Sequence, residues 1–252
     1  MATKIKNILD LVPRDSVLFS SWLAAQGIDR KEQSLYVRSG WLERIVQGVY
    51  KIAGSRPTLF GAVASYNNQL GKACHVGASS ALGLRGYSHF VSMGKPSAYL
   101  FTAKEVRLPG WFCAMEWDMT VKYFTTSIFG GDTCLEVYDY NGAQLLISGP
   151  ERALMECLHL SSEQFSLLDN YYVMEMMTTL RPDLVQQLLE NCSSIKVKRL
   201  FLYMAEKAGH SWFRSLDLSK VDLGKGIRNI SATGRFDNKY QIIIPTELAE
   251  YE

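Results

Sequence analysis

The spacing of hydrophobic residues in the first fifty positions predicts three short helices followed by a hairpin. Apolar residues recur at helical intervals over residues 4–11, and again over residues 20–26. A third helix is predicted over residues 29–39, and a glycine follows it directly. Residues 41–51 form two short apolar runs around a Gln-Gly pair, which predicts two strands joined by a tight turn.

The third helix is predicted to begin with a capping box. Asp29 stands three residues before Glu32, so each side chain can accept a hydrogen bond from the other's backbone amide. The helical period turns Leu35 inward, together with Tyr36 or Val37. The polar residues of the helix are then expected on its outer face: Arg30, Lys31, Gln33, Ser34 and Arg38.

The rest of this N-terminal region is expected to form a small domain around two tryptophans. Trp22 and Trp41 fall where a small core needs bulk, and Ser20 or Ser21 is suited to cap the second helix. The Gly-Ser-Arg-Pro sequence that follows the hairpin predicts a linker. We therefore expect one domain over residues 1–58 and a second over residues 59–252.

The second predicted domain mixes helices and strands, so the fold class is α+β with a small N-terminal head. A strand that runs into a helix is expected over residues 75–84, and Asn141-Gly142 predicts a hairpin turn. A second hairpin is expected over residues 227–244, around Asp237-Asn238. Strands are predicted over 98–101, 119–124, 135–138 and 144–147, and helices over 58–70, 150–158, 164–178, 182–190 and 195–208.

Composition is that of an ordinary globular protein, with 47% hydrophobic and 21% charged residues in 252. No apolar run is long enough to span a membrane, and five dispersed cysteines favour reduced thiols, so a cytoplasmic location is expected.

The net charge is only +2, but it is unevenly distributed. Residues 1–58 hold nine Lys and Arg against five acidic residues, and residues 191–239 hold ten against four. Both basic regions are candidates for contact with a polyanion.

The order helix, helix, helix, hairpin is typical of a winged helix-turn-helix, in which one helix enters the major groove and the hairpin braces the DNA backbone. The third helix is then the recognition helix. An arginine there can pair with guanine and a glutamine with adenine, whereas basic residues of the wing suit phosphates. The predicted DNA-binding residues are Arg30, Lys31, Gln33, Ser34, Arg38, Arg44 and Lys51. The alternative is an ordinary charged helix face.

A second basic cluster falls on the helix predicted over residues 195–208. It is either a solvated helix face or a second nucleic-acid surface. Its members are Lys196, Lys198, Arg199, Lys207 and Arg214. The nearby Gly-Lys-Gly-Ile-Arg sequence at residues 224–228 is interpreted first as a β-turn, because it lacks the Walker pattern of a phosphate-binding loop.

The sequence offers few groups for catalysis. Residues 77–81 miss the nucleophile elbow of hydrolases, because Ala81 stands where its last glycine belongs. His75 and His89 lack a third ligand at metal-binding spacing, so no metal site and no cofactor are expected. Glu151, Arg152 and Glu156 at a predicted helix start are interpreted as ion-paired and dipole-complementing side chains. An enzyme acting on nucleic acid or nucleotide would have to rely on His75, His89 or Glu151.

Motifs along nearly the whole chain resemble the AbiEi-type antitoxins of bacterial type IV toxin–antitoxin (abortive infection) systems. In the head these are Trp-Leu-Ala-Ala-Gln-Gly at 22–27, Tyr-Val-Arg-Ser-Gly-Trp-Leu-Glu at 36–43 and Gly-Val-Tyr at 48–50. Beyond it they are His-Val-Gly at 75–77, Gly-Tyr-Ser-His at 86–89, Leu-Pro-Gly-Trp-Phe at 108–112, Pro-Glu-Arg-Ala at 150–153, Leu-Arg-Pro at 180–182, Ser-Ile-Lys-Val-Lys-Arg-Leu-Phe-Leu at 194–202, Leu-Gly at 223–224 and Lys-Tyr-Gln-Ile at 239–242.

The resemblance implies a repressor that binds inverted repeats in its own promoter through the winged head. It further implies a C-terminal domain that counteracts a nucleotidyltransferase-like toxin without forming a stable complex. The scarcity of catalytic motifs, by itself, predicts that the chain is not an enzyme. Glu32 departs from the expected pattern, because an acid in the recognition helix disfavours phosphate contact; it is assigned to capping. The alternative function is a winged-helix regulator that senses a ligand and has no toxin partner.

Overall fold

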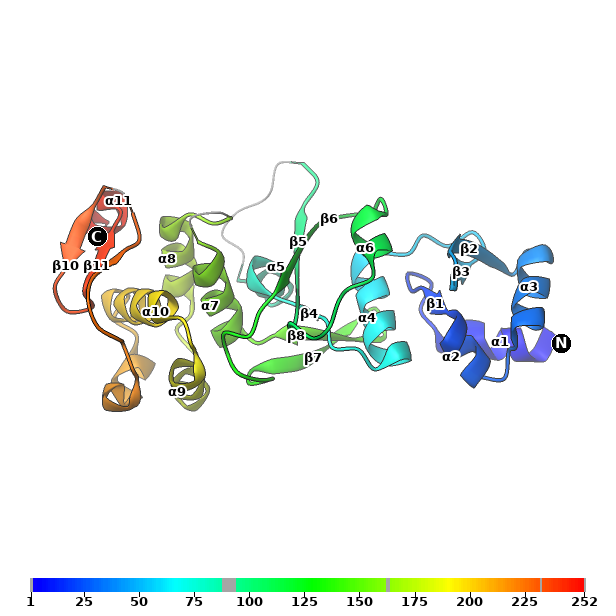
Figure 1. Cartoon of the computed structure of the whole chain (residues 1–252), viewed down its shortest axis with the longest axis horizontal. Coiled ribbons are helices and arrows are strands. Elements are labelled where there is room, and N and C mark those ends of the chain that lie inside the picture. The colour runs from blue at the N-terminus through cyan, green and yellow to red at the C-terminus, as the bar shows by residue number, and fades with distance from the viewer. Residues whose placement is uncertain (1, 88–93, 162–163, 232, 252) are drawn as a thin grey trace. The chain divides into compact units, whose positions relative to one another are not determined.

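The structure is a computed structural model that describes residues 2–87, 94–161, 164–231 and 233–251 (Figure 1). The chain folds into two compact units, and each is built from separate stretches of sequence. The first unit contains residues 1–76, 92–126 and 136–147, and the second contains residues 77–91, 127–135 and 148–252. The predicted boundary after residue 58 falls inside the first unit, directly before a helix, and an independent head domain stays a prediction.

The first unit begins with the predicted winged helix-turn-helix, here called the head. Its strands form an antiparallel sheet in the order β1-β3-β2, in which β2 and β3 are the wing. Gly48, with φ +77°, makes the turn at the wing tip. The elements are α1 (Ala2–Leu11), β1 (Leu18–Phe19), α2 (Ser20–Ala25), α3 (Arg30–Arg38), β2 (Leu42–Val46) and β3 (Val49–Ile52).

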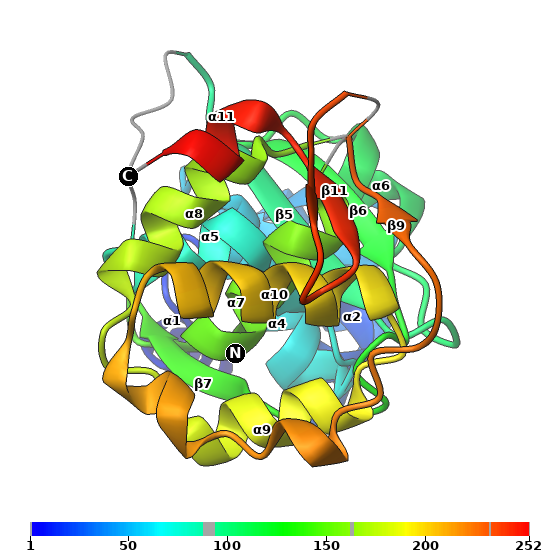
Figure 2. The ribbon, with the colours of Figure 1, turned by 90° about the vertical axis from the view of Figure 1, so that its left-hand side faces the viewer.

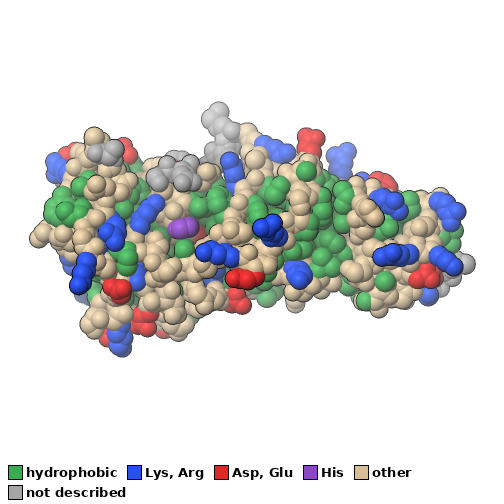
Figure 3. Space-filling model, viewed as in Figure 1, with side chains coloured by type: hydrophobic (Ala, Val, Ile, Leu, Met, Phe, Trp, Pro, Cys, Tyr) green, Lys and Arg blue, Asp and Glu red, His purple; other side chains and the backbone are tan. Residues whose placement is uncertain are grey.

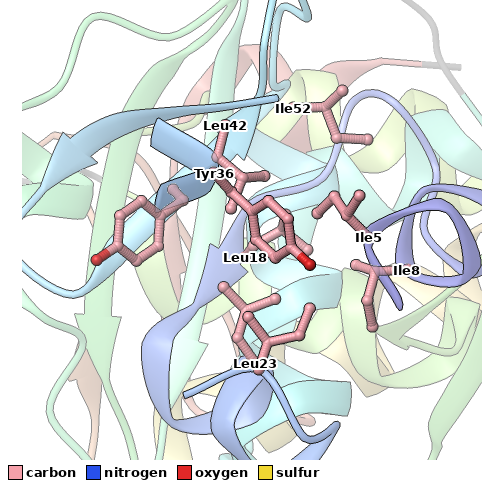
Figure 4. Packing of buried hydrophobic residues seen from close by; sticks show 9 residues of the cluster. Ile5, Ile8, Leu18, Leu23, Tyr36, Leu42 and Ile52 are labelled. Carbon is pink, nitrogen blue, oxygen red and sulfur yellow. The ribbon is translucent and has the colours of Figure 1, made fainter. Parts of the chain in front are cut away.

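The head has its own hydrophobic core, to which every one of its helices and strands contributes (Figure 4). Tyr36 of α3 packs there against aliphatic side chains of α1 and of the sheet, as the close-up shows. The buried members are Ile5, Ile8, Leu18, Leu23, Ile28, Tyr36, Leu42, Tyr50 and Ile52. This core fixes α3 against the wing.

The remainder of the first unit is built on a five-stranded sheet in the order β6-β5-β4-β8-β7. Pairing of β4 with β5 is antiparallel, whereas β5–β6 and β4–β8 pair in parallel. Asn141 and Gly142 both have positive φ and form the predicted turn between β7 and β8. The elements are α4 (Leu59–Leu70), β4 (His75–Val76), β5 (Ser97–Thr102), α6 (Gly110–Ala114), β6 (Thr120–Thr125), β7 (Leu135–Tyr140) and β8 (Ala143–Ser148).

One close contact joins α4 to the segment between α1 and β1 of the head. A Cβ on Gly61 would lie 2.2 Å from the carbonyl oxygen of Asp15, so only glycine fits there. The same carbonyl accepts a hydrogen bond from the amide of Thr58, whose hydroxyl in turn caps α4 by accepting from Gly61 N. The residues on both sides of the predicted boundary are therefore held in one packed arrangement.

The second unit is mainly helical, and its central helix is α7. That helix packs against α5, α8, α9 and α10, and Figure 2 shows α10 crossing in front of it. A small sheet in the order β10-β11-β9 follows α10 in the chain. The elements are α5 (Ala78–Leu84), α7 (Pro150–Leu160), α8 (Leu167–Met176), α9 (Pro182–Asn191), α10 (Ile195–Lys207), η1 (Ser211–Ser215), η2 (Leu218–Lys220), β9 (Arg228–Asn229), β10 (Arg235–Asp237), β11 (Ile242–Ile244) and α11 (Thr246–Glu250).

The structure confirms the α+β class and the predicted elements, with two local corrections. The C-terminal hairpin exists as β10 and β11, but β9 adds a third, parallel strand. Neither Ser20 nor Ser21 is the N-cap of α2, because that position belongs to Phe19, which provides no side-chain cap. Ser20 is already helical, and its hydroxyl is used elsewhere in the head.

Candidate DNA interface of the winged head

The helix predicted to recognise DNA, α3, begins with the predicted capping box. The Oδ1 atom of Asp29 accepts hydrogen bonds from the amides of Lys31 and Glu32 at 2.8 and 2.9 Å, and Glu32 Oε2 accepts from Asp29 N at 3.1 Å. The bond from the Glu32 amide is the main reason that the pKa of Asp29 lies below its usual range. Glu32 also forms an ion pair with Lys4 of α1, so its charge is used inside the head.

The outer face of α3 presents cations at both ends. Arg30, Lys31, Ser34 and Arg38 are exposed, as predicted. Arg30, Ser34 and Arg38 follow one another at intervals of four residues and therefore line one side of the helix. The view in Figure 3 shows Lys and Arg side chains over the head, at the right of the picture. Exposed cations on this face are compatible with the predicted contact with DNA.

Gln33 does not belong to this face, and its prediction as an outward, base-contacting residue is wrong. Its side chain is 1% exposed. The Nε2 atom donates to the carbonyl oxygens of Ser20 and Ile28 at 3.0 and 2.9 Å, and Oε1 accepts from Ser20 Oγ at 2.7 Å. Gln33 thus joins α2, the turn and α3 through three hydrogen bonds, and its function is to position the recognition helix.

Two apolar predictions for the head are also wrong. Leu35 is 37% exposed and Trp41 is 44% exposed, although both were expected in the core. Gln33 and Tyr36 occupy the inward face of α3 instead. Trp41 precedes the buried Leu42, and alternation along the chain directs the two side chains to opposite sides. Trp22, by contrast, is partly buried against the head core.

The two basic residues of the wing differ in how freely they present charge. The exposed Arg44 places its guanidinium 5.8 Å from the centre of the Tyr50 ring. Lys51 instead pairs with Glu43 at 2.9 Å and donates to the carbonyl oxygen of Ser55 at 2.9 Å. Both predicted positions lie on the wing, but the charge of Lys51 is already neutralised by Glu43.

The second predicted basic surface, in the other unit, is not formed as expected, because two of its members are buried in α10. Lys198 is 3% and Arg199 2% exposed. The Arg199 guanidinium donates four hydrogen bonds, and the acceptors are the carbonyl oxygens of Leu223, Gly224, Gly226 and Gln241. Burial lowers the pKa of Arg199. Arg199 therefore holds the 224–228 turn and the β11 segment in place.

The other three members are not gathered at one place. Lys196 donates to the carbonyl oxygen of Ser161 at 2.9 Å, and the Lys207 ammonium lies 5.8 Å from the centre of the Tyr171 ring. Eleven residues of helix separate these two lysines, which corresponds to roughly 16 Å along the axis. Arg214 is exposed in η1. The buried arginine gave no sequence signal, because its carbonyl partners lie 24 to 42 residues away.

The acidic residues at the start of α7 form the ion pairs predicted for them. Glu156 is fully buried and accepts from Arg152 Nε at 3.0 Å, Ala78 N at 2.9 Å and Ser148 Oγ at 2.8 Å. Glu151 pairs with Arg181 at 3.0 Å. These contacts describe a structural network that anchors α7 within the second unit.

The remaining residues considered for catalysis or metal binding show no such arrangement in the part of the chain that is described. His75 is buried and stacks on Phe101 at 5.4 Å, whereas His89 lies outside the described residues. Across residues 2–87, 94–161, 164–231 and 233–251, no three His, Cys, Asp or Glu side chains gather to hold a metal ion. In the same ranges no helix is both long and apolar enough to cross a membrane.

Two protein-family models match nearly the whole chain. Residues 1–93 match the family described as "Transcriptional regulator, AbiEi antitoxin N-terminal domain", and residues 95–245 match "Transcriptional regulator, AbiEi antitoxin, Type IV TA system". The chain belongs to the AbiEi antitoxin family. The family is one of transcriptional regulators in type IV toxin–antitoxin systems.

A solved structure supports the fold of this antitoxin over almost its full length. The crystal structure of the RV2827C protein from Mycobacterium tuberculosis superimposes with a TM-score of 0.65 and is 14% identical in sequence. The match covers 96% of this chain and 90% of that one. At this identity the likeness concerns the fold alone. No curated protein sequence matches the chain.

Proposed function

We propose that this antitoxin represses its own operon by binding inverted repeats in the promoter through the winged head. The exposed cationic face of α3 is the observation that carries the proposal. Arg30 and Lys31 stand at the N-terminal end of the helix, where recognition helices meet base edges, and Arg38 stands at the other end. Arg44 of the wing contributes a backbone contact.

The proposal includes antagonism of a nucleotidyltransferase-like toxin without a stable complex, and it assigns this activity to residues 59–252. Family membership supports it, because the matched description names an antitoxin of a type IV system.

Lys51 is assigned a smaller share of DNA binding than Arg44, since its ammonium is paired with Glu43. Gln33, Lys198 and Arg199 are assigned no contact with nucleic acid, because they are buried.

The test is binding of the full chain to its promoter DNA, measured by gel shift at several salt concentrations. The wild type should prefer the promoter to random DNA of equal length. The double variant Arg30→Ala/Lys31→Ala should lose that preference, and its residual binding should depend less steeply on salt, because each bound head brings two fewer cations to the DNA. Lys225→Ala, an exposed lysine outside the head, is the matched control and should bind as the wild type does.

The same variants separate the two activities in cells that express the toxin. If the assignment is right, Arg30→Ala/Lys31→Ala derepresses a promoter reporter and still protects against the toxin when supplied from a different promoter. Loss of protection in this variant, at unchanged protein level, would contradict the division of labour. Equal affinity of the wild type for promoter and random DNA would contradict the repressor proposal itself.

A further inference from the structure

The exposed face of α3 is uncharged at its centre. Arg30 and Lys31 occupy the first turn and Arg38 the last, while Ser34 and Leu35 lie between them. The hydroxyl of Ser34 is turned back onto its own helix, where it donates to the carbonyl oxygen of Arg30 at 2.9 Å. The middle of the face therefore presents a small side chain beside an exposed leucine.

Leu35 is not part of the head core. The head core receives Tyr36 from this helix, and the buried Gln33 bonds to the backbone of α2 and of the turn. Leu35 projects from the opposite side, next to Lys31, which precedes it by four residues. A lone exposed leucine is common on protein surfaces. This one, however, stands at the centre of a face whose two ends are cationic.

A helix with this face fits the major groove in a defined way. The cations at its ends reach towards phosphates or guanine edges, and the small Ser34 lets the helix backbone approach the bases closely. Leu35 then faces base edges with a side chain that offers no hydrogen bond. Among the four bases of DNA, only thymine presents an apolar group in the major groove, namely its 5-methyl.

We infer that Leu35 is a specificity-determining residue that contacts the 5-methyl group of a thymine in each half-site of the promoter repeat. The inference rests on the proposed function, because it needs α3 in the major groove. The contact buries apolar surface equivalent to about one methylene group. Without the methyl group this burial is lost, which corresponds to roughly fourfold weaker binding per contact. Ser34 allows the approach and carries no base preference of its own in this arrangement.

The experiment replaces thymine by deoxyuracil, which removes the methyl group and keeps every hydrogen-bonding atom of the base. Binding of the full chain to promoter DNA is measured by fluorescence anisotropy at fixed salt, with one thymine position substituted at a time. We expect one position in each half-site at which the wild type loses about fourfold in affinity. Leu35→Ala should bind the unmodified promoter more weakly and respond to deoxyuracil at that position by less than twofold.

One control variant and several possible results test the contact between Leu35 and thymine separately from DNA binding itself. Val137→Ala, which trims an exposed apolar residue of β7, should keep the wild-type response to deoxyuracil. A wild type that prefers its promoter but tolerates deoxyuracil at every position would overturn the inference and leave the repressor proposal standing. Continued deoxyuracil sensitivity of Leu35→Ala, or a changed oligomeric state of that variant, would also overturn it. No preference for promoter DNA at all would remove both proposals.

Discussion

Gln33 provides the sharpest test of how the head is built. The variant Gln33→Met keeps the side-chain volume and removes all three hydrogen bonds to Ser20 and Ile28. A buried hydrogen bond contributes a net of about 1 kcal/mol, so we expect the local stability of the helix-turn-helix to fall by about 2–4 kcal/mol. The loss exceeds that of an ordinary surface substitution because two backbone carbonyls lose donors inside the head.

Native-state hydrogen exchange measures this effect without requiring the two units to unfold together. Amides of α3 should exchange about 100-fold faster in Gln33→Met than in the wild type if the loss is near 3 kcal/mol. Ser34→Ala, a neighbour on the exposed face, is the matched control and should change exchange by less than threefold. Promoter affinity should fall in Gln33→Met without any change in preferred bases. Unchanged exchange, or an altered base preference, would refute the positioning role.

Three further predictions concern other buried or capping groups. Glu156→Gln should destabilise the second unit by about 3–5 kcal/mol in urea unfolding, because it leaves the buried charge of Arg152 uncompensated; a change below 1 kcal/mol would contradict this. Arg199→Met should lower the free energy of unfolding of the second unit by about 2–4 kcal/mol, because four carbonyls lose their donor. Limited proteolysis should then cut first within residues 223–241, and unaltered cleavage sites would argue against the anchoring role of Arg199. The lowered pKa of Asp29 means that its cap is fully effective above the ordinary Asp value of about 3.9 and is lost as pH falls through the lower folded-state pKa. Carboxyl NMR should show Asp29 titrating below the ordinary Asp value, and Asp29→Asn should remove this acid dependence while it preserves α3.

Much of the fold could be predicted from local sequence signals, because these act between near neighbours. The capping pair Asp29 and Glu32, the pattern of the wing and the Asn141-Gly142 turn all appear where expected. Each depends on backbone geometry within a few residues, which a linear sequence displays directly. The family resemblance depended on such signals too, and the family match confirms it.

The sequence by itself therefore determined the order of elements, the winged helix-turn-helix and the family. Tertiary structure decided which polar residues are available to a ligand. Gln33 and Arg199 carry polar side chains and were expected outside, yet each is buried with its hydrogen bonds satisfied. Leu35 is apolar and was expected inside, yet it is exposed. The physical reason is that burial of a polar group depends on partners contributed by distant segments, such as the carbonyls of residues 223–241. Periodicity records the polarity of a residue, whereas its surroundings are set only when the chain has folded.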